Sequence, residues 1–295
     1  MTTLLERCRR GTVLIDGAMG TELQRAGLEI GASGERWNLE MPERVEAIHR
    51  AYVDAGVDVL IANSFNANPW VLERFGLASE MDRINHAAAA IARRAAGTEV
   101  IVLGDIGPFG GFLAPLGEVT LDQVSESFAR QARALLEGGA DGIIVETMSA
   151  IEEAAAAVRA AREAGAPVVV ASMAFERRGK SGVRTMMGVA PDQAARALAD
   201  AGADIVGANC GTNLTFADFS DIVTWMRDAG GRPIVVQPNA GQPELVDGRA
   251  VYGMSPAEFA AGVAPLAAAG AAVLGGCCGT TPPHIRALAT ALRPL

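Results

Sequence analysis

Three cysteines carry the clearest chemical signal in this sequence: Cys277 and Cys278, adjacent near the carboxyl end, and Cys210 upstream of them. A cysteine cluster in a chain of 295 residues indicates metal binding or catalysis rather than a disulfide framework. Three thiolates around a tetrahedral zinc ion leave one position vacant for a substrate, whereas a closed structural zinc site needs a fourth protein ligand. Such a soft site binds an incoming thiol and removes its proton, so we expect alkyl transfer to sulfur.

The fourth cysteine and the three histidines are not expected to close this site. Cys8 precedes the first expected strand and therefore belongs at the opposite end of the fold. His49, His86 and His284 fall in segments of helical period, where packing or surface positions are the commoner roles. The fourth zinc position is therefore expected to stay open for a thiol substrate.

Glycines flank the adjacent cysteines. Successive residues of a regular strand point to opposite faces, so Cys277 and Cys278 can bind one metal only where the backbone turns sharply. Gly275, Gly276 and Gly279 permit such a turn because they lack a side chain. The pair is therefore expected at a sharp turn where a strand ends.

Short runs rich in β-branched residues recur along the chain and are typical of buried strands. Eight strands are expected, at residues 13–16, 59–65, 101–107, 142–147, 168–175, 205–210, 234–241 and 273–279. Segments of helical period lie between them, as at residues 43–55, 123–137, 151–163, 191–201 and 256–269. The repeated order of strand and helix indicates parallel strands.

This alternation predicts an α/β fold, a (β/α)8 TIM barrel formed by a single domain over residues 1–295. No Pro/Ser-rich linker or low-complexity tract divides the chain. An open doubly wound sheet is the structural alternative, but its Gly-x-Gly-x-x-Gly fingerprint is missing after the first expected strand, where residues 16–21 read Asp-Gly-Ala-Met-Gly-Thr. A dinucleotide-binding fold is therefore disfavoured.

Polar residues gather where the expected strands end, which is where the working residues of such barrels lie. Taken singly they have ordinary explanations: Asp16 could cap the following helix, Asn63 could satisfy a loop, and Ser172 could be a small core residue. Together they are expected to converge on one mouth. The full set is Asp16, Asn63, Asp105, Glu146, Ser172, Asn209, Cys210, Asn239, Cys277 and Cys278.

Composition and charge limit the partners. Hydrophobic residues make up 50% of the chain and aromatic residues only 5%, which suits an interior of Ala, Val, Ile and Leu. A net charge of -9 and a pI near 5.0 give no attraction to nucleic-acid phosphates or anionic lipid, so we expect neither nucleic acid nor membrane as a partner. The first ten residues carry charges where a signal peptide has its apolar run, so a cytoplasmic location is expected.

Several segments of the sequence resemble the homocysteine S-methyltransferase family. They are Asp-Gly-Ala-Met-Gly-Thr-Glu at 16–22, Gly-Ile-Ile-Val-Glu-Thr at 142–147, Gly-Ala-Asn-Cys at 207–210, Gln-Pro-Asn-Ala-Gly at 237–241 and Gly-Gly-Cys-Cys-Gly-Thr-Thr-Pro at 275–282. Gly-Asp-Ile-Gly-Pro at 104–108 and Gly-Arg-Ala-Val-Tyr at 248–252 look closer to the homocysteine-binding module of cobalamin-dependent methionine synthase than to betaine-homocysteine methyltransferase. The resemblance spans nearly the whole chain.

The resemblance implies a zinc-dependent enzyme that transfers a methyl group to the thiol of L-homocysteine and so forms methionine. It implies that Cys210, Cys277 and Cys278 are the zinc ligands and the catalytic residues. The small-molecule thiol and Zn2+ are thus the expected substrate and cofactor.

The same resemblance implies how the amino-acid part of the substrate is held. Asp16 and Glu146 would bind its ammonium group, and backbone N–H groups around Gly17 and Ala18 would face its carboxylate. This assignment suits a zwitterion, which needs an anionic partner at one end and N–H donors at the other.

Asn239 ends the expected strand between those that carry Cys210 and Cys277, so its side chain is expected to overhang the metal. From its position alone, Asn239 could equally well form hydrogen bonds with backbone groups of a loop. The resemblance favours a place over the zinc, where the amide oxygen would be a weak ligand that an arriving thiolate displaces.

The sequence leaves the methyl donor open. We expect no room in the chain for the folate and cobalamin modules that follow this module in a full methionine synthase. The candidate donors are S-methylmethionine, S-adenosylmethionine, betaine and a methylated corrinoid protein supplied in trans. Two other readings stay open: a zinc-thiol methyltransferase subunit that docks this or another thiol while a partner catalyses, and a barrel lyase with a structural cysteine cluster.

Overall fold

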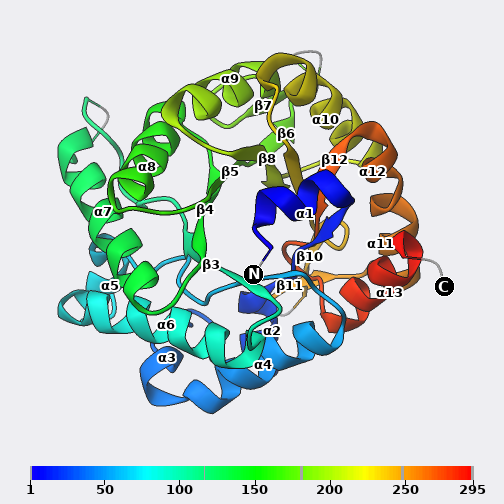
Figure 1. Cartoon of the computed structure of the whole chain (residues 1–295). Helices are drawn as coiled ribbons and strands as arrows, with labels where there is room; N and C mark the ends of the chain where they lie inside the picture. The colour runs from blue at the N-terminus through cyan, green and yellow to red at the C-terminus, as the bar shows by residue number, and fades with distance from the viewer. Residues whose placement is uncertain (1, 116, 180–181, 247–248, 294–295) are drawn as a thin grey trace.

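Eight parallel strands form a closed ring in a computed structural model, which describes residues 2–115, 117–179, 182–246 and 249–293 (Figure 1). Gly248, which begins one segment quoted for the family resemblance, lies outside the described residues. The ring order is β1-β12-β9-β8-β5-β4-β3-β2, and a parallel bridge between Ile15 and Val59 joins its ends. The strands are β1 (Val13–Leu14), β2 (Val59–Ile61), β3 (Ile101–Ile106), β4 (Gly142–Met148), β5 (Val169–Met173), β8 (Ile205–Cys210), β9 (Ile234–Pro238) and β12 (Ala271–Leu274). The predicted α/β barrel is confirmed.

Helices surround the ring and cover its outer face (Figure 1). The larger ones are α4 (Pro42–Asp54), α6 (Met81–Ala96), α7 (Leu121–Glu137), α8 (Ile151–Glu163), α9 (Pro191–Ala201), α10 (Phe216–Gly230), α11 (Pro256–Val263) and α13 (Pro282–Leu292). Shorter helices are α1 (Leu4–Arg10), α2 (Met19–Arg25), α3 (Trp37–Glu40), α5 (Pro69–Glu73), the 3-10 turn η1 (Ala78–Glu80) and α12 (Pro265–Ala269). No helix of the described residues is long and apolar enough to cross a membrane. The single-domain division over residues 1–295 stays a prediction.

The helices expected at 43–55, 123–137, 151–163 and 191–201 correspond to α4, α7, α8 and α9 with small shifts at their ends. The single helix expected at 256–269 is wrong. The chain forms α11 and then α12, and the second helix begins at Pro265. Proline has no N–H for the helical ladder, so it favours the first turn of a new helix over the interior of a longer one.

Several expected strands end too late. The segments expected at 59–65, 234–241 and 273–279 stop at Ile61, Pro238 and Leu274. Pro238 cannot donate to a strand ladder, which limits β9. Beyond the strand ends the loops carry two hairpins that the sequence did not predict, β6 (Phe175–Arg177) with β7 (Val183–Thr185), and β10 (Pro243–Val246) with β11 (Arg249–Tyr252).

The apolar core has two layers, because the strands are buried on both faces. The outer layer lies between the strands and the surrounding helices. The inner layer fills the barrel with Val13, Ile15, Val59, Ile61, Ile101, Leu103, Ile144, Val168, Val170, Ile205, Val235 and Val273. The interior is therefore packed at its amino-terminal end, and a ligand site is left to the carboxyl ends of the strands.

Helix α1 closes the amino-terminal end of the barrel and lies across the ring in Figure 1. Leu4, Leu5 and Cys8 pack against the inner core layer. Burial raises the pKa of the Cys8 thiol to about 11, which keeps it protonated near neutral pH. As predicted, Cys8 lies apart from the other three cysteines.

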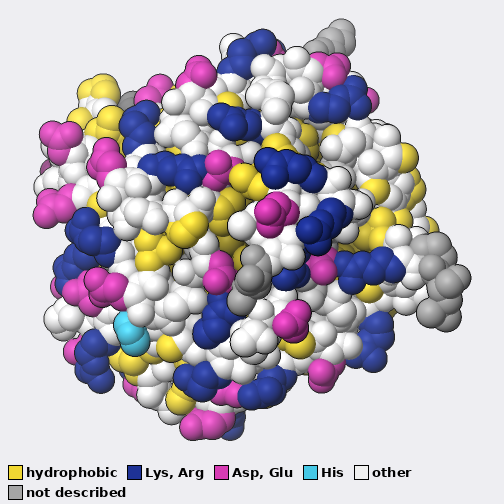
Figure 2. All heavy atoms as spheres, in the orientation of Figure 1, with side chains coloured by type: hydrophobic (Ala, Val, Ile, Leu, Met, Phe, Trp, Pro, Cys, Tyr) yellow, Lys and Arg dark blue, Asp and Glu magenta, His cyan; other side chains and the backbone are white. Residues whose placement is uncertain are grey.

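A repeated ion pair secures the same end of the barrel. An aspartate directly precedes each of three strands: Asp58 before β2, Asp141 before β4 and Asp204 before β8. Each accepts a hydrogen bond from a backbone N–H of a neighbouring strand, namely that of Leu14 at 2.8 Å, Val102 at 2.8 Å and Val169 at 2.9 Å. Each aspartate also pairs with an arginine, namely Arg293, Arg93 and Arg162. Figure 2 shows basic and acidic side chains intermingled over this face. In such barrels the amino-terminal end contributes to stability, and ligands bind at the opposite end.

Candidate functional site

The three predicted cysteines meet at the carboxyl ends of the strands. Cys210 is the last residue of β8, and Cys277 and Cys278 follow β12. Their three Sγ atoms all lie within 4.8 Å of one another, and those of Cys277 and Cys278 are 3.9 Å apart. Two sulfurs bound to one tetrahedral zinc at about 2.3 Å lie about 3.8 Å apart. The three thiols therefore fit a zinc ion with one coordination position left over.

The backbone turns sharply at each thiol. Cys210 has a φ of 56°, which is uncommon for a residue with a Cβ. The carbonyl of Cys277 accepts hydrogen bonds from the N–H and the hydroxyl of Thr280, at 3.1 and 2.7 Å. Gly279 has a φ of 78°, and a Cβ there would lie 2.2 Å from Tyr252 Cγ. The turn that the flanking glycines predicted is present.

Hydrogen bonding among the thiols distributes the negative charge. Hydrogen bonds from Cys277 and Cys278 lower the pKa of Cys210 to about 3. The same contact with Cys210 raises the pKa of Cys277 and brings that of Cys278 to about 11. A bound divalent cation would favour the thiolate form of all three cysteines.

The thiols lie on a cavity of about 660 Å3 at the carboxyl-terminal mouth of the barrel. Its volume suits a small-molecule ligand. The predicted site residues on its wall are Gly17, Ala18, Glu146, Cys210, Cys277 and Cys278, and Asp105 joins them. Six of the ten strand-end residues thus line this cavity, since Asn63 also belongs to its wall, whereas Asp16, Ser172, Asn209 and Asn239 are not among its lining residues.

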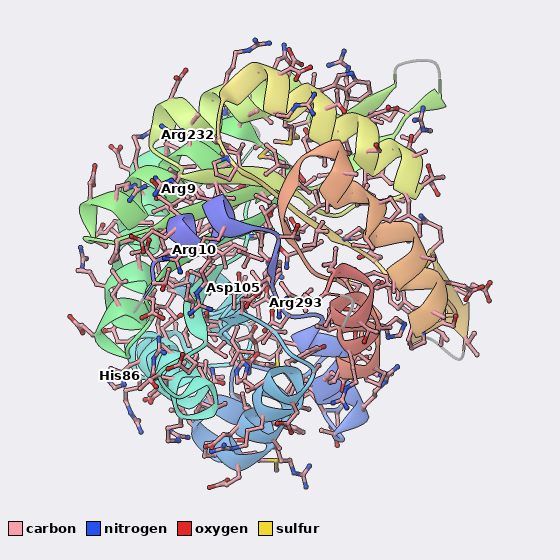
Figure 3. All side chains as sticks on the ribbon, turned by 45° about the vertical axis from the view of Figure 1, so that its right-hand side comes forward. Arg9, Arg10, His86, Asp105, Arg232 and Arg293 are labelled. Atoms are coloured by element: carbon pink, nitrogen blue, oxygen red, sulfur yellow. The ribbon has the colours of Figure 1, made fainter. Side chains whose placement is uncertain are left out.

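Three carboxyl groups gather beside this cavity. Asp16 and Asp105 are buried, and Oδ1 of each has no hydrogen-bond partner among the described residues. Burial and the nearby charge of Glu146 raise the pKa of both aspartates well above the usual range. Burial, with a contribution from Cys210, raises the pKa of Glu146 to about 7. Figure 3 shows Asp105 within the ring of helices. No ion pair joins these three groups to a basic side chain in the described part of the chain, so a ligand could supply the cation.

Asp16 joins the two strands at which the barrel closes. Its Oδ2 accepts a hydrogen bond from Ile61 N–H at 2.9 Å. The alternative that Asp16 caps the next helix is wrong, because the N-cap of α2 is Ala18 and no side chain caps it. One oxygen of Asp16 therefore serves the fold, and the other is buried without a partner among the described residues, although Asp16 does not itself line the cavity.

The segment after Asp16 is clamped between two side chains. Tyr52 Oη donates to the Ala18 carbonyl at 2.9 Å, and Ala18 N–H donates to Thr280 Oγ1 at 3.0 Å. A Cβ on Gly17 would lie 2.6 Å from Thr280 Oγ1 and 3.0 Å from Tyr52 Oη, so only glycine fits. Because Thr280 uses the Ala18 N–H, Gly17 is the better placed of the two predicted backbone donors.

Asn239 lies against Cys210, one residue beyond β9. Its Nδ2 donates to the Gly211 carbonyl at 3.2 Å, while its Oδ1 is buried and has no partner among the described residues. It lines a smaller cavity of about 310 Å3 together with Cys210 and is not among the residues that line the larger cavity. The unpartnered oxygen is compatible with the predicted ligand role, which stays a prediction.

Other candidates have ordinary roles. Asn63 donates to the Gly34 carbonyl and to Asn38 Oδ1, at 2.9 and 3.0 Å, so it holds a loop. His49 is buried in α4, His86 is exposed on α6, and the ring of His284 contacts Thr281 and the Met254 carbonyl. None of the three histidines belongs to the thiol cluster found among the described residues.

Sequence reasoning missed the residues that support the site. The sequence places Asp105 at the mouth but indicates no role for it, and it indicates no role for Thr280 or Tyr52. Thr280 stands three residues after Cys277, inside the most distinctive motif, and that position was the available signal. Tyr52 gave none, because its contact with the first strand's loop depends on how α4 packs.

Comparison with known proteins identifies the family of this chain. Residues 13–292 match the family model described as homocysteine S-methyltransferase. The methionine synthases of Mycobacterium tuberculosis and Mycobacterium leprae are 35% and 34% identical over 309 aligned residues, covering 99% of this chain and 25% of each relative. This chain therefore spans about a quarter of their length.

Solved structures agree with the family assignment. The homocysteine methyltransferase MmuM from Escherichia coli, in its oxidized form, has a TM-score of 0.76 and 26% identity, with 95% of each chain covered. Its metallated form has a TM-score of 0.75 at 24% identity, over 94% of this chain and 95% of that one. The predicted resemblance is thus confirmed along nearly the whole sequence, and the chain belongs to the homocysteine S-methyltransferase family.

Proposed function

We propose that this chain is a zinc-dependent methyltransferase that moves a methyl group to the thiol of L-homocysteine and forms methionine. The observation that carries the proposal is the convergence of Cys210, Cys277 and Cys278 on a cavity that also presents buried carboxylates. Thiolates suit a soft metal and an incoming sulfur, and carboxylates suit an ammonium group. Family membership agrees with both halves of this site.

The three cysteines would hold the zinc. When bound, Zn2+ supplies a Lewis acid that lowers the pKa of a coordinated thiol, so that homocysteine reacts as a thiolate at neutral pH. Asn239 would offer its Oδ1 to the open position while no thiol is present, since that oxygen is buried and lacks another partner among the described residues.

The carboxylates would bind the ammonium group. An ammonium has three N–H donors, and Asp16, Asp105 and Glu146 offer three acceptors. Asp16 and Asp105 each keep one oxygen unpartnered among the described residues, and Glu146 lines the cavity. The N–H of Gly17 would meet the substrate carboxylate. This cradle fixes the amino acid by its polar end and leaves the thiol directed at the cysteines.

The transfer itself is a displacement at carbon. The homocysteine thiol releases its proton to water, and the resulting thiolate sulfur attacks the methyl carbon of the donor. The bond between that carbon and the donor atom breaks, and the electron pair leaves with the donor. The protein contributes by holding the thiolate in line with the methyl group, which converts a bimolecular encounter into a positioned one.

The charges of the cavity favour a cationic donor. Its wall includes Glu35, Asp105 and Glu146 against the guanidinium of Arg74. S-Methylmethionine, S-adenosylmethionine and betaine each carry a positively charged sulfonium or quaternary ammonium centre, and such a centre beside these carboxyl groups would favour their ionised form. A methylated corrinoid protein is the other candidate donor, and the similarity to relatives named methionine synthase supports it.

A donor panel tests the proposal. The zinc-loaded chain is incubated with homocysteine and each of the three onium donors, and methionine is measured by mass spectrometry. We expect turnover with at least one onium donor and none after chelation of zinc. Methionine formed only when a methylated corrinoid protein is added would instead assign the chain as a subunit. Undiminished turnover by the metal-free chain would contradict the zinc role, and no methionine with any donor would contradict the function.

A further inference from the structure

The side chain of Asn209 touches both halves of the site, and we propose that it is the positioning residue that holds them in register. It would fix the backbone beside the substrate-binding Glu146 and donate a hydrogen bond to the thiol cluster. The inference rests on the proposed function and assigns a residue to which neither the family match nor the predicted ligand set gives a role.

The amide of Asn209 is fully buried and fully used. Its Oδ1 accepts hydrogen bonds from Thr147 N–H at 2.8 Å and from Ser172 Oγ at 2.7 Å. Its Nδ2 donates to Thr147 Oγ1 at 2.7 Å and lies 3.9 Å from Cys277 Sγ. A backbone N–H can only donate, so Oδ1 must face Thr147, and the donor side of the amide must then face the sulfur.

The partner of this amide has a strained backbone. Thr147 has a φ of 61°, a conformation that is costly for a β-branched residue and persists only where its surroundings hold it. The pairing of β4 with β5 shifts register between Val145 and Met148, so this stretch leaves the regular ladder. The amide oxygen of Asn209 takes the Thr147 N–H that the ladder gives up.

This contact sets the direction of Glu146. Ile144 belongs to the inner core layer, and Glu146 lies two residues further along β4, on the same inward face. A fixed Thr147 backbone determines how the strand ends and hence where the Glu146 carboxylate enters the cavity. Loss of the Asn209 amide would release that carboxylate from its position.

The other side of the amide acts on the metal site. Asn209 directly precedes Cys210, whose φ of 56° also departs from the strand conformation. The Asn209 Nδ2 contact with Cys277 Sγ joins the thiol of one strand end to the backbone of another. Hydrogen bonds to ligand atoms orient them and adjust their donor strength. Asn209 is therefore linked to the Glu146 carboxylate through the Thr147 backbone, to Cys210 as its neighbour in sequence, and to Cys277 by a hydrogen bond.

A role in the stability of the barrel alone does not explain why residue 209 is an asparagine. Inward positions deeper in these strands are apolar, such as Val170 on β5 and Ile205 on β8, so the barrel itself does not need an amide. An apolar residue would bury no polar group and would cost nothing in desolvation. The amide is used on its two chemically distinct sides by two parts of the site.

Three variants test the inference with two readouts that do not depend on turnover. Asn209→Leu removes both sides of the amide, and Asn209→Asp keeps the acceptor and loses the donor. Ser172→Ala is the matched control: it removes one hydrogen bond to the amide oxygen and leaves the contacts of Asn209 with Thr147 and Cys277, and Ser172 does not line the cavity. Homocysteine affinity is measured by calorimetry. Cobalt substituted for zinc reports the thiolates through its sulfur-to-metal absorption band.

For Asn209→Leu we expect homocysteine affinity to fall about tenfold or more and the cobalt band to shift. Loss of a group that supports a metal site typically lowers metal affinity or activity by about 10–100-fold. Asn209→Asp should shift the band and weaken homocysteine less, and Ser172→Ala should resemble the unmodified chain in both. If Asn209→Leu does not fold, the Asn209→Asp comparison decides. The inference is overturned if Ser172→Ala changes homocysteine affinity and the cobalt band as much as the Asn209 variants do. It is also overturned if the Asn209 variants change neither. An unmodified chain that binds neither cobalt nor homocysteine overturns the proposed function as well.

Discussion

The Sγ atoms of Cys277 and Cys278 lie 3.9 Å apart although the residues are neighbours in sequence, because the chain leaves β12 and turns around them. A regular strand would have sent the two side chains to opposite faces. Both sulfurs instead face Cys210, and the fourth cysteine packs under the barrel with α1.

Metal content should follow this arrangement. We expect about one zinc per chain, as in other three-thiolate sites with an open position. Cys278→Ala should lower the zinc content several-fold and abolish methyl transfer while the far-ultraviolet circular dichroism stays native. Cys8→Ala, which removes the distant cysteine, should keep the zinc and is the control. Inductively coupled plasma mass spectrometry of both variants makes the comparison, and equal zinc in the two would exclude Cys278 as a ligand.

Removal of the Glu146 charge should weaken homocysteine binding. A hydrogen bond to a charged group is worth about 1.5–3 kcal/mol, so Glu146→Gln should raise the dissociation constant roughly 10-fold to 150-fold. Calorimetry with homocysteine gives the value. Glu152→Gln, an exposed change on α8, should leave the affinity unchanged.

A substrate analogue separates loss of charge from general damage to the site. 4-Mercaptobutyrate lacks the ammonium group, so Glu146→Gln should leave its affinity much closer to that of the unmodified chain. Asp105→Asn should show the same pattern if Asp105 is the third acceptor. A variant that loses both ligands equally has a disturbed cavity, and its carboxylate then has no special part in holding the ammonium.

Gly17 should tolerate no side chain. Its Cβ would lie 2.6 Å from Thr280 Oγ1, so Gly17→Ala must push the clamp apart. We expect a loss of about 1–3 kcal/mol in the free energy of unfolding, typical of overpacking. Gly20→Ala is the matched control, because no atom lies within 4 Å of the added Cβ. Urea unfolding of both variants measures the difference, and similar stabilities would show that the clamp yields easily.

The stability of the fold should depend on pH through His49. Burial lowers the pKa of His49 to about 4 from 6.5. Below pH 6.5 the unfolded chain binds a proton that the folded chain does not, so stability falls as the pH drops from 6.5 towards 4. The full loss is about 3 kcal/mol.

His49→Leu should flatten this dependence. The expected result is a smaller difference in unfolding free energy between pH 7 and pH 5 than in the unmodified chain, measured by urea titration at both values. His86→Gln, on the exposed face of α6, should keep the original difference. An identical pH dependence in His49→Leu would mean that another group causes the acid sensitivity.

The barrel and the thiol cluster were predictable because their signals are local. β-Branched runs, helical periods and the Gly-Gly-Cys-Cys-Gly segment can each be recognised without knowing the rest of the fold. Strand ends were less predictable, as at Leu274, because a strand stops where its neighbour stops pairing. Pro265 does indicate a break in the helix expected at 256–269, because proline disfavours the interior of a helix.

The supporting contacts required the structure. Asp16 meets Ile61 because the first two strands close the barrel, and Asn209 meets Thr147 across an intervening strand. Pairs so far apart in sequence leave no spacing pattern to read. The same holds for the clamp formed by Tyr52 and Thr280, which lie 228 residues apart.

The central claim is that the substrate thiol binds directly to a zinc held by three cysteines, and X-ray absorption at the zinc edge tests it most directly. Spectra are recorded on the zinc-loaded chain before and after addition of L-homocysteine. The predicted result is three sulfur ligands and one oxygen or nitrogen ligand before addition, and four sulfur ligands after it. Three sulfur ligands in both spectra, with homocysteine bound by calorimetry, would contradict the account.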